Sequence, residues 1–304
     1  MKIIGYQVVP KRLPSWFRSF ALVIPMLATV LVVSLFPVLR TVWMSFRDSA
    51  LTSNTDHFVG AANYHKLWHD RLFWQSWWQT IEFATVTTCV ETLAGLGIAL
   101  TLNARFPGRG AARAMVLVPW AIPSVVTGRM FNWLFDQGGA INYLLVRSHL
   151  ATRPVEFLGS TTWALRTLMI ADIWKTTPFM ALLLLAGLQT IPPHLTEVAR
   201  LDGISAWGRF RCVVLPLLLP SLLVAALLRM LDAVRVFDLP YAVTGGGPAS
   251  STETLSTYSY NLLFAGLDLG SGSAVATATF VAEIGIGCAF GIFVILSVRR
   301  DGRS

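Results

Sequence analysis

The sequence predicts an all-α membrane protein with six transmembrane helices. Hydrophobic residues make up 54% of the 304-residue chain and charged residues only 13%, which is about half the usual charged share. Residues 19–39 and 176–196 each form a run of 21 residues without Asp, Glu, Lys or Arg. A helix that crosses a bilayer needs about 20 mainly apolar residues. Several runs of this kind in one chain exclude a soluble globular domain.

Six segments are long enough to cross about 30 Å of hydrocarbon at roughly 1.5 Å per residue. The predicted spans are residues 19–46, 77–104, 112–135, 162–189, 212–240 and 274–298. Their prolines are compatible with membrane helices, because neighbouring groups satisfy the freed carbonyls. Gly287 and Gly291 form the G-x-x-x-G spacing of closely packed membrane helices. The predicted organisation is a cytoplasmic segment over 1–18, a six-span domain over 19–298 and a cytoplasmic tail over 299–304.

The distribution of Lys and Arg predicts the orientation of the spans. If the N-terminus is cytoplasmic, the cytoplasmic segments hold 13 of these residues and the outer loops hold five. The outer loop over 241–273 holds none. This bias predicts that both termini are cytoplasmic. The net charge of +8 then reflects loops that face anionic lipid, so we expect no nucleic-acid partner.

Six acidic and five basic residues lie inside the predicted spans, apart from Arg40 and Arg113 near the ends of two spans. A buried charge costs on the order of 3 kcal/mol even on permissive scales, so these residues should face a partner or a wet cavity. Asp172 and Lys175 are three residues apart and share one helix face. Two interpretations remain open, a translocation cavity for a polar solute and a set of structural ion pairs between helices. The fifth span carries a charge at every third position, at Arg229, Asp232, Arg235 and Asp238.

Nine residues are candidates for the path of a solute. They combine carboxylate, amide and basic groups with aromatic rings, which could stack on sugar rings, although aromatic residues are common in any membrane bundle. The three cysteines show no metal-ligand spacing, so we expect no metal site. The candidates are Asn132, Trp133, Asp172, Lys175, Asp232, Arg235, Asp238, Tyr241 and Glu283.

The loop between the fourth and fifth spans, residues 191–211, leaves the membrane but keeps helical character. Leu195, Val198 and Leu201 lie at helical spacing beside exposed charges, and Gly203 would end the helix. The pattern predicts a short amphipathic helix on the cytoplasmic face. Such a helix can dock into a groove of a partner protein or lie on lipid head groups, and the pattern leaves both interpretations open.

This loop resembles the signature of ABC-importer permeases, E-A-A, three residues, G, nine residues and I-x-L-P. Every spacing is kept, and Val stands in place of the first Ala of E-A-A and in place of Ile. Segments 174–180, 186–189, 237–241 and 244–248 resemble the MalF-like sugar-importer branch, so the resemblance covers almost the whole chain. The large outer domain of maltose-type MalF is absent. The signature falls on Glu197-Val198-Ala199, Gly203, Val213, Leu215 and Pro216.

The resemblance implies a type I ABC-importer permease fold in the cytoplasmic membrane of a bacterium. The chain would move a sugar by alternating access, with a disaccharide such as trehalose as the first expectation and a glycerol-phosphate-type solute as the second. It would work with a second homologous permease, an extracytoplasmic solute-binding protein and two ATPase subunits that bind Mg-ATP. The chain itself would be non-catalytic and hold no cofactor. The implied ATPase-coupling residues are Glu197, Ala199, Asp202, Gly203, Leu215 and Pro216.

Two other functions remain as alternatives. No G-x-x-x-x-G-K-[ST] motif occurs in the chain, which agrees with ATP binding on partner subunits. An ion-coupled secondary transporter could use Glu91, Asp232 or Glu283 as carriers, but many such folds contain inverted repeats and none is evident. A membrane-embedded glycosyl or lipid transferase would need a carboxylate cluster at one membrane face, whereas the acids here are dispersed.

Overall fold

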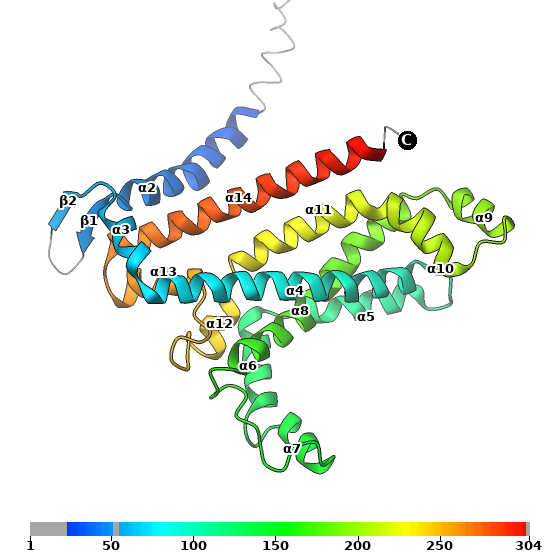
Figure 1. Ribbon diagram of the computed structural model, residues 1–304, viewed down its shortest axis with the longest axis horizontal. Helices are drawn as coiled ribbons and strands as arrows, with labels where there is room; N and C mark the ends of the chain where they lie inside the picture. The colour runs from blue at the N-terminus through cyan, green and yellow to red at the C-terminus, as the bar shows by residue number, and fades with distance from the viewer. Residues whose placement is uncertain (1–22, 51–54, 302–304) are drawn as a thin grey trace, which may run out of the picture.

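Long apolar helices form most of the structure (Figure 1). The computed structural model describes residues 23–50 and 55–301. The predicted segment 1–18 and the last three residues of the predicted tail lie outside this range. Within it, five helices are long and apolar enough to cross a membrane, and a bent pair makes up to six. The five are Val23–Met44, Arg71–Asn103, Ala164–Gln189, Ala206–Val234 and Leu269–Ile292, and the bent pair is Arg109–Ala121 with Ser124–Arg147.

The helices run back and forth between two ends of the molecule (Figure 1). We call them the hairpin end, which holds the strands β1 (Arg47–Ala50) and β2 (Thr55–Phe58), and the α9 end. The C-terminal end of α14 lies towards the α9 end. The helices are α2 (Phe36–Met44), α3 (Ala62–His69), α4 (Arg71–Asn103), α5 (Arg109–Ala121), α6 (Ser124–Phe135), α7 (Ala140–Arg147), α8 (Ala164–Gln189), α9 (Pro193–Leu201), α10 (Ala206–Arg209), α11 (Leu215–Val234), α12 (Asp238–Val243), α13 (Leu255–Tyr260) and α14 (Leu269–Asp301).

The core lies where α4, α8 and α11 pack together. Two glycines allow this close approach. A Cβ at Gly187 of α8 would lie 2.7 Å from the Cβ of Ser221 on α11. A Cβ at Gly95 of α4 would lie 2.8 Å from the Cγ of Met180 on α8. By contrast, a Cβ at Gly287 would have no neighbour within 4 Å among the described residues, so this part of the G-x-x-x-G spacing makes no close contact within the chain.

The predicted third span, 112–135, is broken into two helices at an angle of 87°. Ile122 is extended between α5 and α6, with φ −75° and ψ 131°. Pro123 follows it and disfavours a helical conformation of the preceding residue. The predicted third span is therefore not one continuous helix but is bent at Pro123.

The predicted fifth span, 212–240, also ends early. Helix α11 stops at Val234, Arg235 caps its C-terminus, and α12 begins at Asp238. Pro240 lies in the first turn of α12, where a missing N–H leaves no helical hydrogen bond unmade. If α11 continued through this position, Pro240 would remove one helical hydrogen bond. The start of a new helix avoids this loss.

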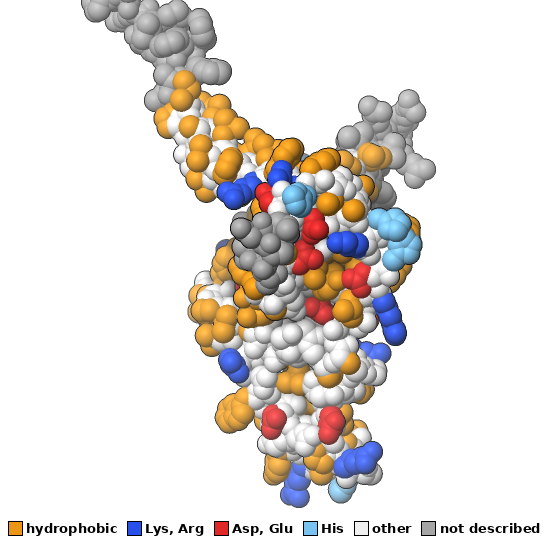
Figure 2. All heavy atoms as spheres, turned by 90° about the vertical axis from the view of Figure 1, so that its left-hand side faces the viewer, with side chains coloured by type: hydrophobic (Ala, Val, Ile, Leu, Met, Phe, Trp, Pro, Cys, Tyr) orange, Lys and Arg blue, Asp and Glu red, His pale blue; other side chains and the backbone are white. Residues whose placement is uncertain are grey.

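The hairpin end contains the strands that the all-α prediction missed. β1 and β2 are antiparallel, with Arg47 opposite Phe58 and Ala50 opposite Thr55. The Nε of Arg47 donates to the Oδ1 of Asp56 across the pair at 2.5 Å. Charged and histidine side chains lie on the surface of this end (Figure 2), as expected of a part outside the hydrocarbon.

Asp70 joins the start of α4 to α13 at the hairpin end. Its Oδ1 accepts from the backbone N–H of Leu72 at 2.8 Å and so caps α4. Its Oδ2 accepts from the hydroxyl of Tyr258. Burial, followed by this hydrogen bond to a carboxylate, raises the pKa of Tyr258 above its ordinary value. The phenol therefore keeps its proton, and continues to donate to Asp70, to a higher pH than an ordinary tyrosine would.

Candidate functional site

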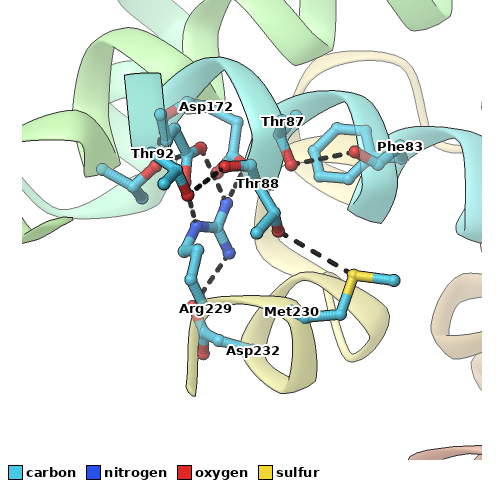
Figure 3. A network of polar contacts seen from close by, with 10 residues as sticks. Phe83, Thr87, Thr88, Thr92, Asp172, Arg229, Met230 and Asp232 are labelled. Carbon is cyan, nitrogen blue, oxygen red and sulfur yellow. Dashed lines mark hydrogen bonds and ion pairs between the residues drawn. The ribbon is translucent and has the colours of Figure 1, made fainter. Parts of the chain in front are cut away.

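A cluster of buried charges joins α4, α8 and α11 (Figure 3). Arg229 of α11 donates to both carboxylate oxygens of Glu91 on α4 and to the Oδ2 of Asp172 on α8. Thr176, one turn after Asp172, donates to the Oε1 of Glu91 at 2.6 Å. The side chains of Glu91 and Arg229 are 0% and 3% exposed. One guanidinium thus holds carboxylates from two other helices.

Asp232 extends this cluster towards solvent. The Nη1 of Arg229 lies 3.3 Å from its Oδ2, and the Asp232 side chain is 68% exposed. Buried charges are stable only when they are paired and hydrogen-bonded, so Glu91 and Asp172 depend on Arg229. For Glu91, Asp172 and Arg229 the geometry favours the ion-pair interpretation. Asp232 also faces open space.

A cavity of about 300 Å³ opens beside the cluster. This volume is at the lower end of the range of ligand pockets, roughly 300–1,000 Å³. Three acidic and three basic side chains line the cavity, so its formal charge balances. Ser124 and Thr176 add hydroxyl groups, and Phe237 adds an aromatic ring. The charged residues of the wall are Asp172, Lys175, Arg229, Asp232, Arg235 and Asp238.

Five of the nine candidates for the solute path line this cavity. They are Asp172, Lys175, Asp232, Arg235 and Asp238. The break between α11 and α12 brings the last three together, because Arg235 caps one helix and Asp238 begins the next. The predicted row of charges on one continuous helix was wrong, although its members do gather at one site.

The other four candidates lie elsewhere. Asn132 donates to the carbonyl oxygen of Val243 at 3.3 Å and thereby links α6 to α12. The side chain of Trp133 is exposed. Tyr241 stacks on Phe237 at a centroid distance of 5.0 Å. Glu283 on α14 lies 3.9 Å from Arg235, and both line a second, more apolar cavity of about 590 Å³.

Glu91 and Arg229 were missing from the candidates, although they form the centre of the cluster. They are 138 residues apart in the sequence, so no spacing within one helix indicates their pairing. The sequence feature that could have identified these two residues is their charge at positions deep inside the predicted spans.

The predicted amphipathic helix is confirmed as α9. It ends in a Schellman motif, in which Gly203 donates to the carbonyl oxygen of Arg200 at 3.2 Å and Ile204 donates to that of Ala199 at 3.1 Å. Gly203 has φ +75°, a conformation that favours glycine. Asp202 is the C-cap of the helix.

Helix α9 exposes hydrophobic side chains that the described part of the chain leaves largely uncovered. Leu201 is 87% exposed and Val198 is 53% exposed, whereas Ala199 is buried. Glu197 lies on the exposed surface of the helix. Leu215 and Pro216 form the first turn of α11. Helix α9 therefore presents hydrophobic side chains together with an acidic group.

The chain resembles curated transport proteins along most of its length. It is 44% identical to the trehalose/maltose transport system permease protein MalF of Thermococcus litoralis, over 86% of this chain and 88% of that protein. It is 37% identical to the sulfoquinovosyl glycerol transport system permease protein SmoG of Agrobacterium fabrum, over 97% of this chain and 98% of that protein.

Solved transporters share the fold. A chain of a bacterial ABC transporter involved in the import of the acidic polysaccharide alginate superposes with a TM-score of 0.78 at 20% identity, over 94% of this chain and 96% of that one. A chain of the MetNI methionine ABC transporter in an inward-facing conformation gives a TM-score of 0.56 at 20% identity, over 74% of this chain and 96% of that one. Residues 91–300 match the family described as binding-protein-dependent transport system inner membrane component. The chain belongs to this family of ABC-importer permeases.

Proposed function

We propose that this permease carries a neutral sugar, with a disaccharide such as trehalose as the first candidate, through the cavity beside Asp232 and Asp238. The observation that carries the proposal is the balanced lining of three acidic and three basic side chains with two hydroxyl groups. Such a wall offers donors and acceptors to a polyhydroxylated solute without a net field that would attract an ion. The names of the trehalose/maltose relative and the sulfoquinovosyl glycerol relative support sugars as the substrate class.

The balance of charge also ranks the candidate solutes. A surplus of basic groups would favour an anionic solute such as a glycerol-phosphate, because arginine binds carboxylate and phosphate groups well. The lining holds no such surplus. A neutral disaccharide therefore fits this wall better than the glycerol-phosphate-type alternative.

Helix α9 is proposed to couple transport to ATP hydrolysis. Its exposed Val198 and Leu201 suit a hydrophobic cleft of a partner, and the exposed Glu197 could pair with a basic group there. The partner would be one of two cytoplasmic ATPase subunits that bind Mg-ATP. Their closure would move this chain and a second permease between inward-facing and outward-facing states, and an extracytoplasmic binding protein would deliver the solute.

The orientation follows from the same assignment. If α9 is cytoplasmic, the end of α14 is too, because both lie at one end of the molecule (Figure 1). This arrangement supports a C-terminus on the cytoplasmic side of a bacterial inner membrane, and the charge bias of the sequence extends the proposal to the N-terminus. The arginines of that end, among them Arg105, Arg109 and Arg200, agree with the charge bias of membrane proteins.

The buried cluster favours the ATP-driven mechanism over the ion-coupled alternative. Glu91 is held by Arg229 and Thr176, so it is not a free carrier for a proton or a sodium ion. The two other acids considered as ion carriers are Asp232 and Glu283. Asp232 lies near Arg229, and Glu283 lies near Arg235.

Uptake by vesicles tests the proposal. We expect trehalose to accumulate when this permease, its partner permease, both ATPase subunits, the binding protein and internal ATP are present. Asp238→Asn should lower uptake while the complex stays assembled. Accumulation driven by an ion gradient without the ATPase subunits would contradict the ATP-driven mechanism, and loss of assembly in the variant would favour a structural role for Asp238.

A second arm tests coupling. Glu197→Ala should leave the complex in the membrane and lower the number of sugar molecules imported per ATP hydrolysed. His194→Ala, at another exposed position of α9, is the matched control and should transport normally. Equal behaviour of the two variants would contradict the assignment of Glu197.

A further inference from the structure

A third cavity, of about 560 Å³, lies at the α9 end, away from the proposed sugar path. Its wall combines the end of α4, the start of α5, the end of α8 and part of α9. Three arginines line it, namely Arg105, Arg109 and Arg113, and no acidic residue does. The cavity therefore has a strong positive charge of its own.

These guanidinium groups are not neutralised within the part of the chain that the structure describes. None of the three lies within 4.0 Å of a carboxylate in residues 23–50 and 56–292, whose side chains the structure describes. The Nη2 of Arg113 donates to the carbonyl oxygen of Leu102 at 3.2 Å. The Nε of the same group is buried and has no acceptor among the described residues. A buried donor without an acceptor is uncommon, and an ordered water or a bound anion can supply the acceptor.

The start of α5 adds to the positive field of the cavity. Helix α5 has 13 residues and begins at Arg109, and neither a side-chain cap nor an acidic residue satisfies its first turn. The free N–H groups and the dipole of a helix start favour an anion. Several guanidinium groups beside a helix start suit the oxygens of a phosphate, which accept more than one hydrogen bond.

The apolar part of the wall indicates where the phosphate comes from. Leu100, Leu188 and Ile191 line the same cavity, and the first two lie near the ends of the membrane-spanning helices α4 and α8. If α4 and α8 cross the bilayer, their ends lie at the depth of the lipid head groups. The half-buried Leu100 and Ile191 can then contact an acyl chain, whereas a soluble phosphate would make no contact with these apolar side chains.

We propose that this cavity binds the phosphate group of an anionic phospholipid, held by Arg105, Arg109 and Arg113. The lipid contacts α9 as well, because Pro193 and Thr196 belong to the cavity wall. It thereby links α9 to the start of α5. The binding itself does not depend on which solute the permease carries.

Retention of lipid by the purified complete transporter tests this site. The complex is extracted from vesicles of phosphatidylglycerol and phosphatidylcholine, and native mass spectrometry counts the phosphatidylglycerol molecules that remain bound. Replacement of all three arginines by Gln should lower this retention at least about tenfold, since each charge-assisted hydrogen bond that is lost weakens binding. Arg105→Gln alone, in an exposed loop, should lower it several-fold without disturbing the helices.

The matched control removes the same amount of charge from the same end. Arg200→Gln/Arg209→Gln/Arg211→Gln lies outside the cavity and should retain phosphatidylglycerol to within about twofold of the unmodified chain. Equal losses in the two triple variants would show a diffuse surface effect and overturn the site. Two results would overturn the lipid as the ligand. One is displacement of phosphatidylglycerol by millimolar inorganic phosphate. The other is thermal stabilisation of the transporter by inorganic phosphate, in phosphatidylcholine alone, that equals the stabilisation by phosphatidylglycerol.

Discussion

Removal of Arg229 should destabilise the permease far more than removal of its exposed partner. Arg229→Met strands the carboxylates of Glu91 and Asp172, whose side chains are 0% and 6% exposed. Breaking a buried ion pair by deleting one partner costs about 3–5 kcal/mol. Asp232→Asn affects a side chain that is 68% exposed at 3.3 Å, and an exposed pair contributes about 0–1 kcal/mol.

Unfolding in detergent can measure this difference. The purified chain is titrated with sodium dodecyl sulfate and followed by tryptophan fluorescence, and the expected loss corresponds to a change in the unfolding constant of about 150- to 5,000-fold. The variant Glu91→Gln/Asp172→Asn/Arg229→Met removes all three buried charges and should recover most of the lost stability. A cost below about 1 kcal/mol for Arg229→Met, or a triple variant no more stable than the single one, would refute the reasoning.

Three further perturbations separate backbone, packing and capping effects. Gly203→Val should strain the end of α9 by about 1–2 kcal/mol through its φ of +75° alone, because no atom of the described residues lies within 4 Å of a Cβ there; it should lower uptake per ATP, and Gly203→Asn should lower it less. Gly187→Val should cost about 1–3 kcal/mol by overpacking in the detergent titration, whereas Gly287→Val, whose Cβ has no neighbour within 4 Å in the part of the chain that the structure describes, should not; equal costs would contradict the packing argument. Asp70→Ala should cost about 1–2 kcal/mol by loss of the α4 cap, against about 0–1 kcal/mol for Asp56→Ala in an exposed pair, and a reversed order would be inconsistent with the assigned cap.

Hydropathy predicted the spans well where a helix is straight. The predicted fourth span, 162–189, compares with Ala164–Gln189 in the structure, because apolar length is a local property that the sequence carries directly. Breaks were harder to predict. The backbone opens at Pro123 and a new helix starts before Pro240, yet α8 continues through Pro178. The same residue type has different outcomes because packing around each site decides whether the lost hydrogen bond is tolerated.

The candidate site was less accessible from the sequence than the fold. Asp172 and Lys175 could be placed together from their spacing on one helix, and the structure has both in the cavity wall. The pairing of Glu91 with Arg229 depends on the contact between α4 and α11, which no local pattern encodes. The strands of the hairpin end were not predicted, because strands of four residues form only when they are paired.

The two interpretations of the intramembrane charges, cavity and ion pairs, both hold within one structure. Arg229 and Asp172 belong to both, since they line the cavity and pair with each other, and Arg229 holds α4 and α8 to α11. A loss of uptake in an Arg229 variant therefore cannot distinguish a solute contact from a failed brace. Asp238 is exposed, lines the same cavity and makes no ion pair with any described residue. Replacement of Asp238 changes the cavity wall without leaving a buried charge unpaired. A lower uptake by Asp238→Asn with unchanged stability would therefore identify this cavity as the path of the solute.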